Sequence, residues 1–221
     1  MLLSLGWEEA LSDVVGSGPE AEERELILAS QKGDLDSFNK LVERYQRQVY
    51  NLALRMLGLG QAAEDATQEA FLSAFRAIRG FRGGSFKAWL LRITANACYD
   101  QLRLARRRPS TSLEAILDDP ARSSELATLE SPDESPEDRL QRLELARVIN
   151  HCLARLPTEQ RLVVVLCDIQ GLSYDEAAQA AGCSLGTVKS RLSRGRSHLR
   201  NLLRQHRELL PRKFVLNNGK E

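Results

Sequence analysis

Residues 172–199, LSYDEAAQAAGCSLGTVKSRLSRGRSHL, predict two short helices joined by a tight turn. Ser173, followed three residues later by Glu176, has the pattern of a capping box, which marks the start of a helix. Gly182 permits the left-handed backbone conformation that a tight turn between helices requires. Ser184 can cap a second helix directly after that turn. The stretch therefore has the pattern of a helix-turn-helix.

The second of these helices has two chemically different faces. At about 100° per residue, one face carries Leu185, Val188, Leu192, Gly195 and Leu199. Ser190, Ser193, Arg194 and Ser197 lie opposite, with Lys189, Arg196 and Arg200 on one flank and Arg191 on the other. Serine and arginine side chains can reach base edges in the major groove, while flanking cations contact phosphates. The face is typical of a helix that reads duplex DNA.

An ordinary solvated helix face is the alternative interpretation of the same residues. Solvated faces usually mix charges of both signs. Residues 184–207 instead contain seven Lys/Arg and no Asp/Glu, which favours nucleic-acid binding. This motif alone does not separate a repressor, a response-regulator output domain and a sigma factor.

Charge is segregated along a chain that is nearly neutral overall. The 221 residues carry a formal net charge of +1, with 43% hydrophobic and 28% charged residues, which is typical of a soluble globular protein. Residues 76–108 hold nine Lys/Arg against one acid, and residues 114–138 hold nine acids against one base. Two basic blocks that flank an acidic segment predict two surfaces for anionic partners and a linker between them.

Apolar residues recur at helical spacing on both sides of that segment, and no stretch shows strand-type alternation. We expect helices near 20–34, 36–57, 62–78, 86–107, 140–156 and 158–169, before the helix-turn-helix. The predicted fold class is all-α, with two small helical domains joined by a flexible linker. The expected order is an N-terminal extension (1–21), a first domain (22–108), a linker (109–137), a second domain (138–205) and a C-terminal tail (206–221). The extended linker could reach about 95 Å, so the two halves need not touch.

The first domain offers two further surfaces. The helix predicted over 86–107 follows a glycine-rich loop, and Ser85 can cap it. Arg92, Asn96, Tyr99 and Arg103 share one stripe of this helix, with Trp89 at its border. The apolar residues of the same helix point elsewhere and have the spacing of core positions: Phe86, Leu90, Ile93 and Ala97. Aromatic residues interleaved with Arg and Asn suit a single-stranded nucleic acid, although Trp89 fits a core position equally well. On the helix before the loop, one face carries Asp65, Gln68, Glu69 and Leu72, which indicates either a protein partner or a solvated acidic face.

The motifs on these surfaces occur together in a known family. Residues 63–103, AEDATQEAFLSAFRAIRGFRGGSFKAWLLRITANACYDQLR, resemble the second conserved region of bacterial sigma factors, most closely those of the extracytoplasmic-function (ECF) type. Residues 156–203 resemble the fourth region. Each motif alone is a moderate signal, whereas the ordered pair, with a linker and no extra domain between them, is specific. The larger sigma factors carry a third domain, and the linker here is too short and too polar for one.

The resemblance implies a transcription initiation factor that binds core RNA polymerase and has no catalytic activity or cofactor of its own. It implies core-polymerase binding by Asp65, Gln68, Glu69 and Leu72. It implies recognition and melting of the promoter −10 element, with capture of the single-stranded non-template strand, by Arg82, Gly84, Ser85, Phe86, Lys87, Trp89, Arg92, Asn96 and Arg103. It implies binding of the −35 duplex by Thr187, Lys189, Ser190, Arg191, Ser193, Arg194 and Arg196. An anti-sigma factor is a further implied partner.

Two other classes of protein remain as alternatives. One is a two-domain helix-turn-helix regulator that binds duplex DNA without polymerase and prefers a palindrome as a dimer. The other is a nucleic-acid enzyme, which would need a carboxylate or metal cluster. Glu64, Asp65 and Glu69 lie on one helix with no His or Lys partner near in sequence, so we do not expect an enzyme.

The remaining sequence features favour a cytoplasmic protein without a metal. Cys98, Cys152, Cys167 and Cys183 form no CxxC pair and fall in apolar helical contexts, so we expect reduced, buried thiols. His151 beside Cys152 is too small a cluster to predict a metal site. No run approaches the ~20 apolar residues of a membrane span, so no membrane insertion is expected. The N-terminus lacks the basic start of a signal peptide.

Overall fold

A computed structural model of the chain describes residues 19–107 and 135–205. All regular elements in these two ranges are helical, as the fold class predicted. Most of the expected extension and linker, Arg108 and the expected tail lie outside the described residues. Among the described residues, no helix combines the length and the apolar character that crossing a bilayer requires.

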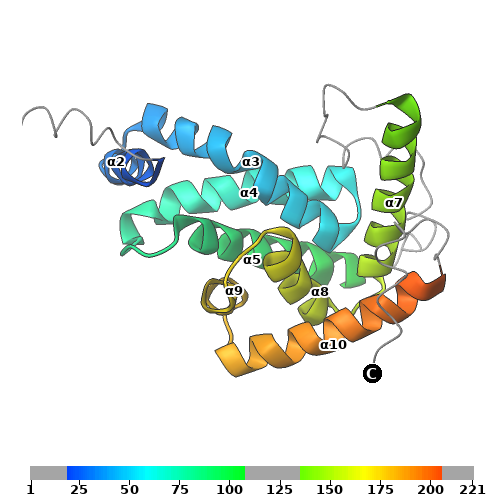
Figure 1. Cartoon of the computed structure of the whole chain (residues 1–221). Coiled ribbons are helices and arrows are strands. Elements are labelled where there is room, and N and C mark those ends of the chain that lie inside the picture. Colours follow the sequence, from blue (N-terminus) through cyan, green and yellow to red (C-terminus); the bar gives the residue numbers. More distant parts are fainter. Residues whose placement is uncertain (1–18, 108–134, 206–221) are drawn as a thin grey trace, which may run out of the picture.

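The first half contains four α-helices: α2 (Pro19–Gln31), α3 (Leu35–Leu57), α4 (Gly60–Ala77) and α5 (Phe86–Arg107), with a short 3-10 turn, η1 (Ile78–Gly80), after α4. The side chain of Asp34 caps α3, and Gly58 ends it with a left-handed φ of 74°. Helices α3, α4 and α5 pack side by side, with α2 across one end (Figure 1). An aromatic cluster fills that end, where the rings of Phe38 and Phe75 meet edge to face at 5.0 Å.

The second half contains α7 (Pro136–Ala154), α8 (Thr158–Val164), η4 (Val165–Ile169), α9 (Tyr174–Ala181) and α10 (Leu185–Leu203). The sequence predicted one helix over 158–169, but its last five residues form a π turn, in which the Gln170 amide donates to the Val165 carbonyl at 2.9 Å. The predicted caps of the helix-turn-helix are present. Ser173 and Glu176 form the capping box, Gly182 has a φ of 61°, and Ser184 accepts from the Thr187 amide at 3.2 Å.

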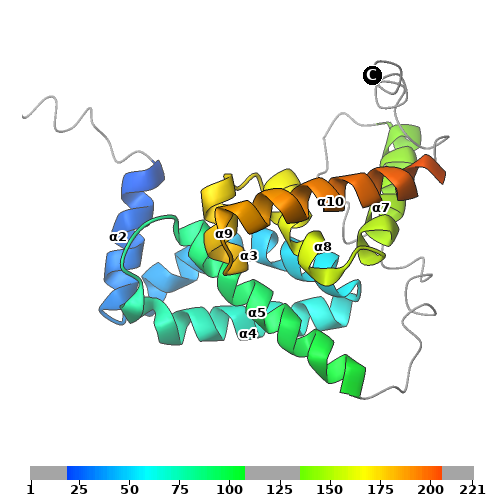
Figure 2. The same cartoon turned by 90° about the horizontal axis from the view of Figure 1, so that it is seen from below.

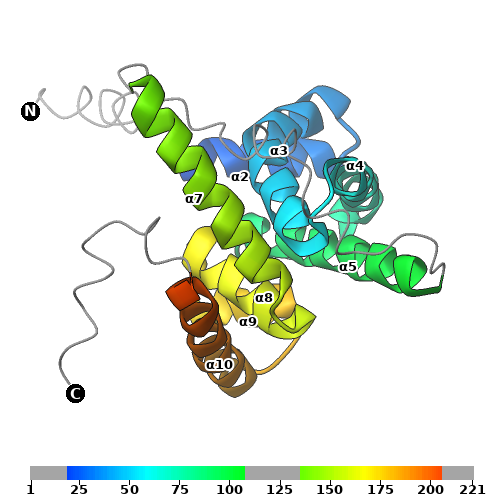
Figure 3. The ribbon, with the colours of Figure 1, turned by 90° about the vertical axis from the view of Figure 1, so that its right-hand side faces the viewer.

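The two halves pack against each other, whereas the sequence analysis allowed them to stay apart. Helix α9 lies beside α5, and α7 lies against α3 (Figures 2 and 3). One hydrophobic cluster includes Leu52 and Leu91 from the first half and Leu153, Leu162 and Leu192 from the second. The length of the linker sets only an upper limit on the distance between the two halves. How the halves pack is decided by the burial of their complementary apolar faces.

A buried arginine joins the halves at the end of α3. Arg161 on α8 is 8% exposed, and its Nη1 donates to the Met56 carbonyl of α3 at 2.7 Å. Its Nη2 donates to the carbonyls of Ala154 and Leu156, where α7 ends. These hydrogen bonds satisfy carbonyls that a helix C-terminus leaves free, and burial lowers the pKa of Arg161.

Candidate nucleic-acid interface

Helix α4 presents the predicted protein-binding stripe to solvent. Asp65, Gln68, Glu69 and Leu72 are all exposed, and Leu72 is 52% exposed. The opposite face of α4 consists of buried alanines, which allow close packing against the neighbouring helices. The structure places the stripe on one accessible face, and its binding role remains a prediction.

The loop before α5 is open and is anchored from a distance. Gly83 and Gly84 have φ of 101° and 87°, conformations that favour glycine, and a Cβ at either position would meet no atom within 4 Å. Gln31 on α2 holds the base of this loop, since its Nε2 donates to the carbonyls of Ile78 at 3.1 Å and Phe81 at 2.8 Å. The sequence analysis did not identify Gln31, because no local pattern connects residues 47 and 50 positions apart.

Ser85 caps α5 as predicted and lies at the end of the loop. Its Oγ accepts from the Ala88 amide at 3.2 Å. Arg82 and Gly84 are exposed beside it, as are Arg92, Asn96 and Arg103 along α5. This part of the predicted −10 surface is therefore accessible at its loop and along one stripe of the helix.

Phe86 requires a correction. It is 2% exposed, and its ring packs against Tyr45, Phe81 and Trp89 at centroid distances of 5.5, 5.6 and 5.3 Å. A ring buried on these sides cannot contact a nucleotide, so Phe86 supports the loop from below. Trp89 packs against the same cluster but is only partly buried, so its core contacts leave part of the ring accessible, and its role in DNA binding stays a prediction.

The recognition helix α10 has the predicted division into faces. Val188, Leu192 and Gly195 are buried, and Thr187 is partly buried near the N-terminus. Lys189, Ser190, Ser193, Arg194 and Arg196 are exposed. Gly195 allows close approach to α8, since a Cβ there would lie 2.8 Å from Cγ2 of Val164.

Two of the predicted DNA-binding cations on α10 are held by acids of their own domain. Arg191 forms an ion pair with Glu159 of α8. Arg196 donates from its Nε to Asp168 of the π turn at 3.0 Å. Arg194 is paired with no acid within residues 19–107 and 135–205, and it folds back on its own helix, with its Nε donating to the Ser190 carbonyl at 3.2 Å. The ion pairs link α10 to α8 through Arg191 and to the π turn through Arg196, contacts that the helical-wheel argument could not include.

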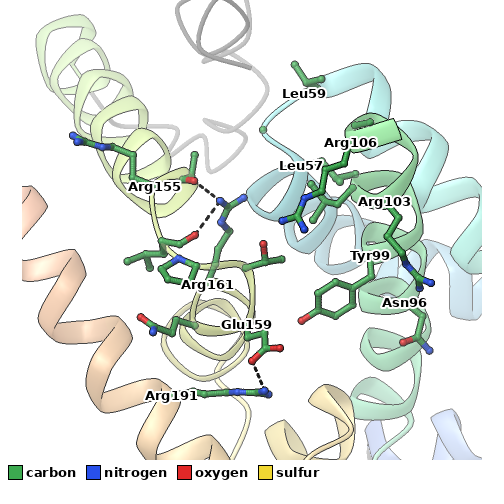
Figure 4. A pocket seen from close by; sticks show the side chains of 18 of the residues that line it. Leu57, Leu59, Asn96, Tyr99, Arg103, Arg106, Arg155, Glu159, Arg161 and Arg191 are labelled. Atoms are coloured by element: carbon green, nitrogen blue, oxygen red, sulfur yellow. Dashed lines mark hydrogen bonds and ion pairs between the residues drawn. The ribbon is translucent and has the colours of Figure 1, made fainter. Parts of the chain in front are cut away.

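Residues of both predicted DNA surfaces line one cleft between the halves (Figure 4). Its volume is about 1040 Å³. Asn96 and Arg103 reach it from α5, and Arg191 and Arg194 reach it from α10. Tyr99 of α5 also faces the cleft, and desolvation raises its pKa. The surfaces that were expected to contact separate promoter elements face one another in this arrangement.

A second contact covers part of the −10 surface directly. Nζ of Lys87 donates to the Gln170 carbonyl at 2.6 Å. The hydrogen bond from the Ser173 amide lowers the pKa of Glu176 on α9, and the nearby Ser85 hydroxyl lowers it further. Ser85 and Arg92 thus lie near the helix-turn-helix, with Arg92 beside its turn, and Lys87 lies against the end of the π turn that precedes it.

Comparison with known proteins matches each half of the chain to a family model. Residues 41–108 match the family model described as Sigma-70 region 2, and residues 146–199 match the model described as Sigma-70, region 4. The ECF RNA polymerase sigma factor SigM of Mycobacterium tuberculosis is 36% identical over 189 residues, covering 85% of this chain and 88% of that protein. The ECF RNA polymerase sigma factor SigE of Mycolicibacterium smegmatis is 40% identical over 172 residues, covering 78% of this chain. The match spans 63% of SigE, so somewhat less than two thirds of that relative is represented.

A solved structure has the same fold. It contains the sigma factor RpoE in complex with the anti-sigma factor NepR from Bartonella quintana. The sigma factor is 26% identical to this chain with a TM-score of 0.59, and the match covers 77% of this chain and 98% of that one.

Proposed function

The chain belongs to the sigma-70 family of RNA polymerase sigma factors, in its ECF group, and on this premise we propose how its surfaces divide the work of promoter recognition. It binds core RNA polymerase through the stripe Asp65, Gln68, Glu69 and Leu72, and it directs the enzyme to promoters that carry a −10 and a −35 element. The exposed stripe on α4 carries this proposal. A regulator that acts on DNA alone has no use for an acidic, partly apolar face opposite its nucleic-acid surface.

The −10 element is bound and opened by the loop and α5. Opening a duplex requires unpairing and unstacking, which costs a few kcal/mol per base step, and captured bases that stack on protein offset that cost. Trp89 supplies a partly exposed aromatic ring. The glycine loop leaves room beside it for a base, and Arg82 and Arg92 supply cations for the backbone. Phe86 contributes by holding the loop and Trp89 in place.

The −35 element is read as duplex by α10. Arg194 and the serines at 190 and 193 share the exposed face, and arginine can form paired hydrogen bonds with guanine in the major groove. Lys189 lies at the edge of that face and suits a phosphate. The ion pairs of Arg191 and Arg196 hold the helix at a fixed angle on the domain.

The protein itself performs no chemical step in this proposal, since RNA synthesis belongs to the polymerase. It acts in the cytoplasm, where core polymerase and promoters are. A protein inhibitor of the anti-sigma type is a further partner, supported by the complex of the related RpoE with NepR.

Transcription from a random promoter library tests the proposal. We expect the chain plus core polymerase to enrich transcripts with two conserved upstream elements, while the chain alone binds promoter duplex weakly. Robust binding of a palindrome by the isolated chain, with no effect of polymerase, would instead establish the DNA-binding regulator.

Charge reversal tests the polymerase-binding stripe separately. Asp65→Lys or Glu69→Lys should weaken core binding by at least about tenfold, because an interface charge is replaced by one of opposite sign. Glu43→Lys is the matched control, since Glu43 is exposed on α3 and the change in net charge is identical. Equal core affinity for the stripe variants and the control, measured by fluorescence anisotropy with labelled protein, would refute the assignment.

A further inference from the structure

Positive charge is concentrated in the cleft between the halves (Figure 4). Among the described residues, its lining contains six arginines and one acid, Glu159. Both halves contribute to these arginines, which are Arg103, Arg106, Arg155, Arg161, Arg191 and Arg194. The space that they line is called the arginine cleft below. The whole chain has a formal net charge of only +1, so the excess of cations is a local feature. Charge of one sign in a concave surface concentrates ligands of the opposite sign.

Most arginines of the cleft are not neutralised by an acid of the protein. Arg103 pairs with Asp100 at 2.8 Å, and Arg191 pairs with Glu159. Within residues 19–107 and 135–205, the remaining four form no ion pair: Arg106, Arg155, Arg161 and Arg194. A guanidinium group matches phosphate oxygens with two parallel hydrogen bonds. The arginine cleft therefore has cationic donors available for an anionic ligand.

Arg161 is the arginine for which a missing counter-charge matters most. It is 8% exposed, its two terminal nitrogens donate to main-chain carbonyls, and its Nε has no hydrogen-bond partner in the described part of the chain. Desolvation lowers its pKa, and no neighbouring carboxylate opposes that effect. A buried charge without an opposite charge is unfavourable. An anion in the cleft would therefore stabilise this guanidinium group.

The α5 side of the cleft supplies an aromatic ring. Tyr99 is partly buried, and its ring points from α5 into the cleft, toward α8 (Figure 4). Arg106 extends into the same space from the same helix (Figure 4). Leu57, Leu102 and Pro157 add apolar atoms to the lining. A planar base can stack on such a ring while arginines contact phosphates. The proposed function assigns neither Tyr99 nor Arg106 to DNA.

We propose that the arginine cleft binds a nucleoside polyphosphate, with its base on Tyr99 and its phosphates on Arg106 and Arg161. A nucleotide combines an aromatic ring system with several negative charges, as the two sides of the cleft require. The volume of about 1040 Å³ lies at the upper end of the range for small-molecule sites, about 300–1000 Å³. This site goes beyond the proposed function, which includes no small-molecule ligand.

Binding of a labelled nucleotide to the free chain tests the site. The probes are ATP and GTP with a fluorescent N-methylanthraniloyl group on the ribose, added to the full chain without polymerase, DNA or magnesium. We expect saturable binding of one nucleotide per chain, measured by fluorescence anisotropy. Because polymerase and promoter are absent, the result does not depend on the proposed function.

Substitutions on α5 test the two contacts separately. Arg106→Ala should weaken binding by at least about tenfold, because a charge-assisted hydrogen bond to phosphate is lost. Tyr99→Leu should weaken it by at least about fivefold through loss of stacking, whereas Tyr99→Phe should retain it. Arg24→Ala is the matched control, because Arg24 is exposed on α2, lies outside the cleft, and its loss changes the net charge equally. Arg161 is left intact, since its hydrogen bonds to carbonyls also support the fold.

Competition and thermal unfolding identify the ligand class. Unlabelled ATP or GTP should displace the probe at lower concentration than inorganic tripolyphosphate, which has no base. Bound nucleotide should raise the Tm of the wild-type chain and of Arg24→Ala, but not that of Arg106→Ala at the same concentration, because only a ligand that binds the folded state stabilises it. Arg106 is exposed, so its substitution leaves the fold intact, and circular dichroism verifies this.

Three results would each overturn the proposal. The first is absence of saturable binding, or equal affinity of Arg106→Ala and Arg24→Ala, which would mean that no specific site exists. The second is displacement by tripolyphosphate as effective as by ATP and GTP, which would exclude recognition of a base. The third uses a single-stranded oligonucleotide with the −10 sequence from the promoter library. If this −10 oligonucleotide displaced the probe at far lower concentration than either nucleotide, the cleft would belong to the nucleic-acid surface instead.

Discussion

Gly195 lies where α10 crosses α8, and replacing it with alanine tests whether this approach positions the recognition helix. The new Cβ would lie 2.8 Å from Cγ2 of Val164 and 3.4 Å from Cβ of Gln160. Val164 is 1% exposed and β-branched, so its side chain has one strongly preferred rotamer in a helix and cannot turn aside. Overpacking of this kind costs about 1–3 kcal/mol. The higher helix propensity of alanine returns about 1 kcal/mol.

Gly186→Ala on the same helix provides the matched comparison. Gly186 is exposed, and the nearest atom to its added Cβ would be Oγ of Ser184 at 3.9 Å, which is an ordinary contact. Both variants gain helix propensity, so the difference between them isolates the packing cost. We expect Gly195→Ala to be less stable than Gly186→Ala by about 1–3 kcal/mol, or roughly 2–12 °C in Tm for a chain of this size.

Urea denaturation followed by far-UV circular dichroism measures the difference in free energy of unfolding. A shift of α10 on α8 should also weaken binding of the −35 duplex, which can be measured with holoenzyme on a promoter whose −10 element is unchanged. If Gly195→Ala proved as stable as Gly186→Ala, the close approach of α10 to α8 would be refuted.

Three further predictions use residues outside the recognition helix. Gln31→Ala should weaken binding of the −10 oligonucleotide by about 3- to 10-fold without loss of core binding, since two loop carbonyls lose their donor; equal strand affinity would show that the loop positions itself. Arg161→Met should lower the free energy of unfolding by about 2–3 kcal/mol, because the Met56 carbonyl and the end of α7 lose a buried charged donor; an unchanged urea midpoint would contradict this. Burial raises the pKa of Cys98 to about 12, so iodoacetamide should leave this thiol unmodified at pH 8 in the folded protein and alkylate it in urea; rapid labelling of the native protein would show that α5 is not buried as described.

Local features of the fold could be predicted from the sequence because each depends on neighbouring residues. The caps at Ser85, Ser173 and Ser184 and the left-handed turn at Gly182 need only the correct residue type at the correct spacing. The exposed stripe on α4 followed from helical periodicity in the same way. These features were expected and are present.

Features that depend on contacts between distant segments could not be predicted. Gln31 reaches the loop from another helix, and Arg161 reaches across the two halves. Phe86 is a different case, because helical spacing placed it with the core residues and only the resemblance assigned it to DNA; its contacts with Tyr45 and Trp89 confirm the core position. The π turn closes its hydrogen bond over one residue more than an α-helical turn does. The apolar run of this segment is equally compatible with a continuous α-helix, so the sequence did not indicate the difference.

Three hydrogen bonds that join the two halves share one chemical property. Those from Lys87, Arg161 and Gln170 all end on main-chain carbonyls, at Gln170, Met56 and Gln48. A carbonyl is the same acceptor whatever side chain its residue carries. Substitution at Gln48 or Met56 therefore leaves the acceptor in place, and only the donors need to be retained. Among relatives that share this arrangement, we therefore expect no covariation between a donor residue and the residue whose carbonyl accepts its hydrogen bond. A chimera in which α3 is replaced by the α3 of a relative should keep these hydrogen bonds.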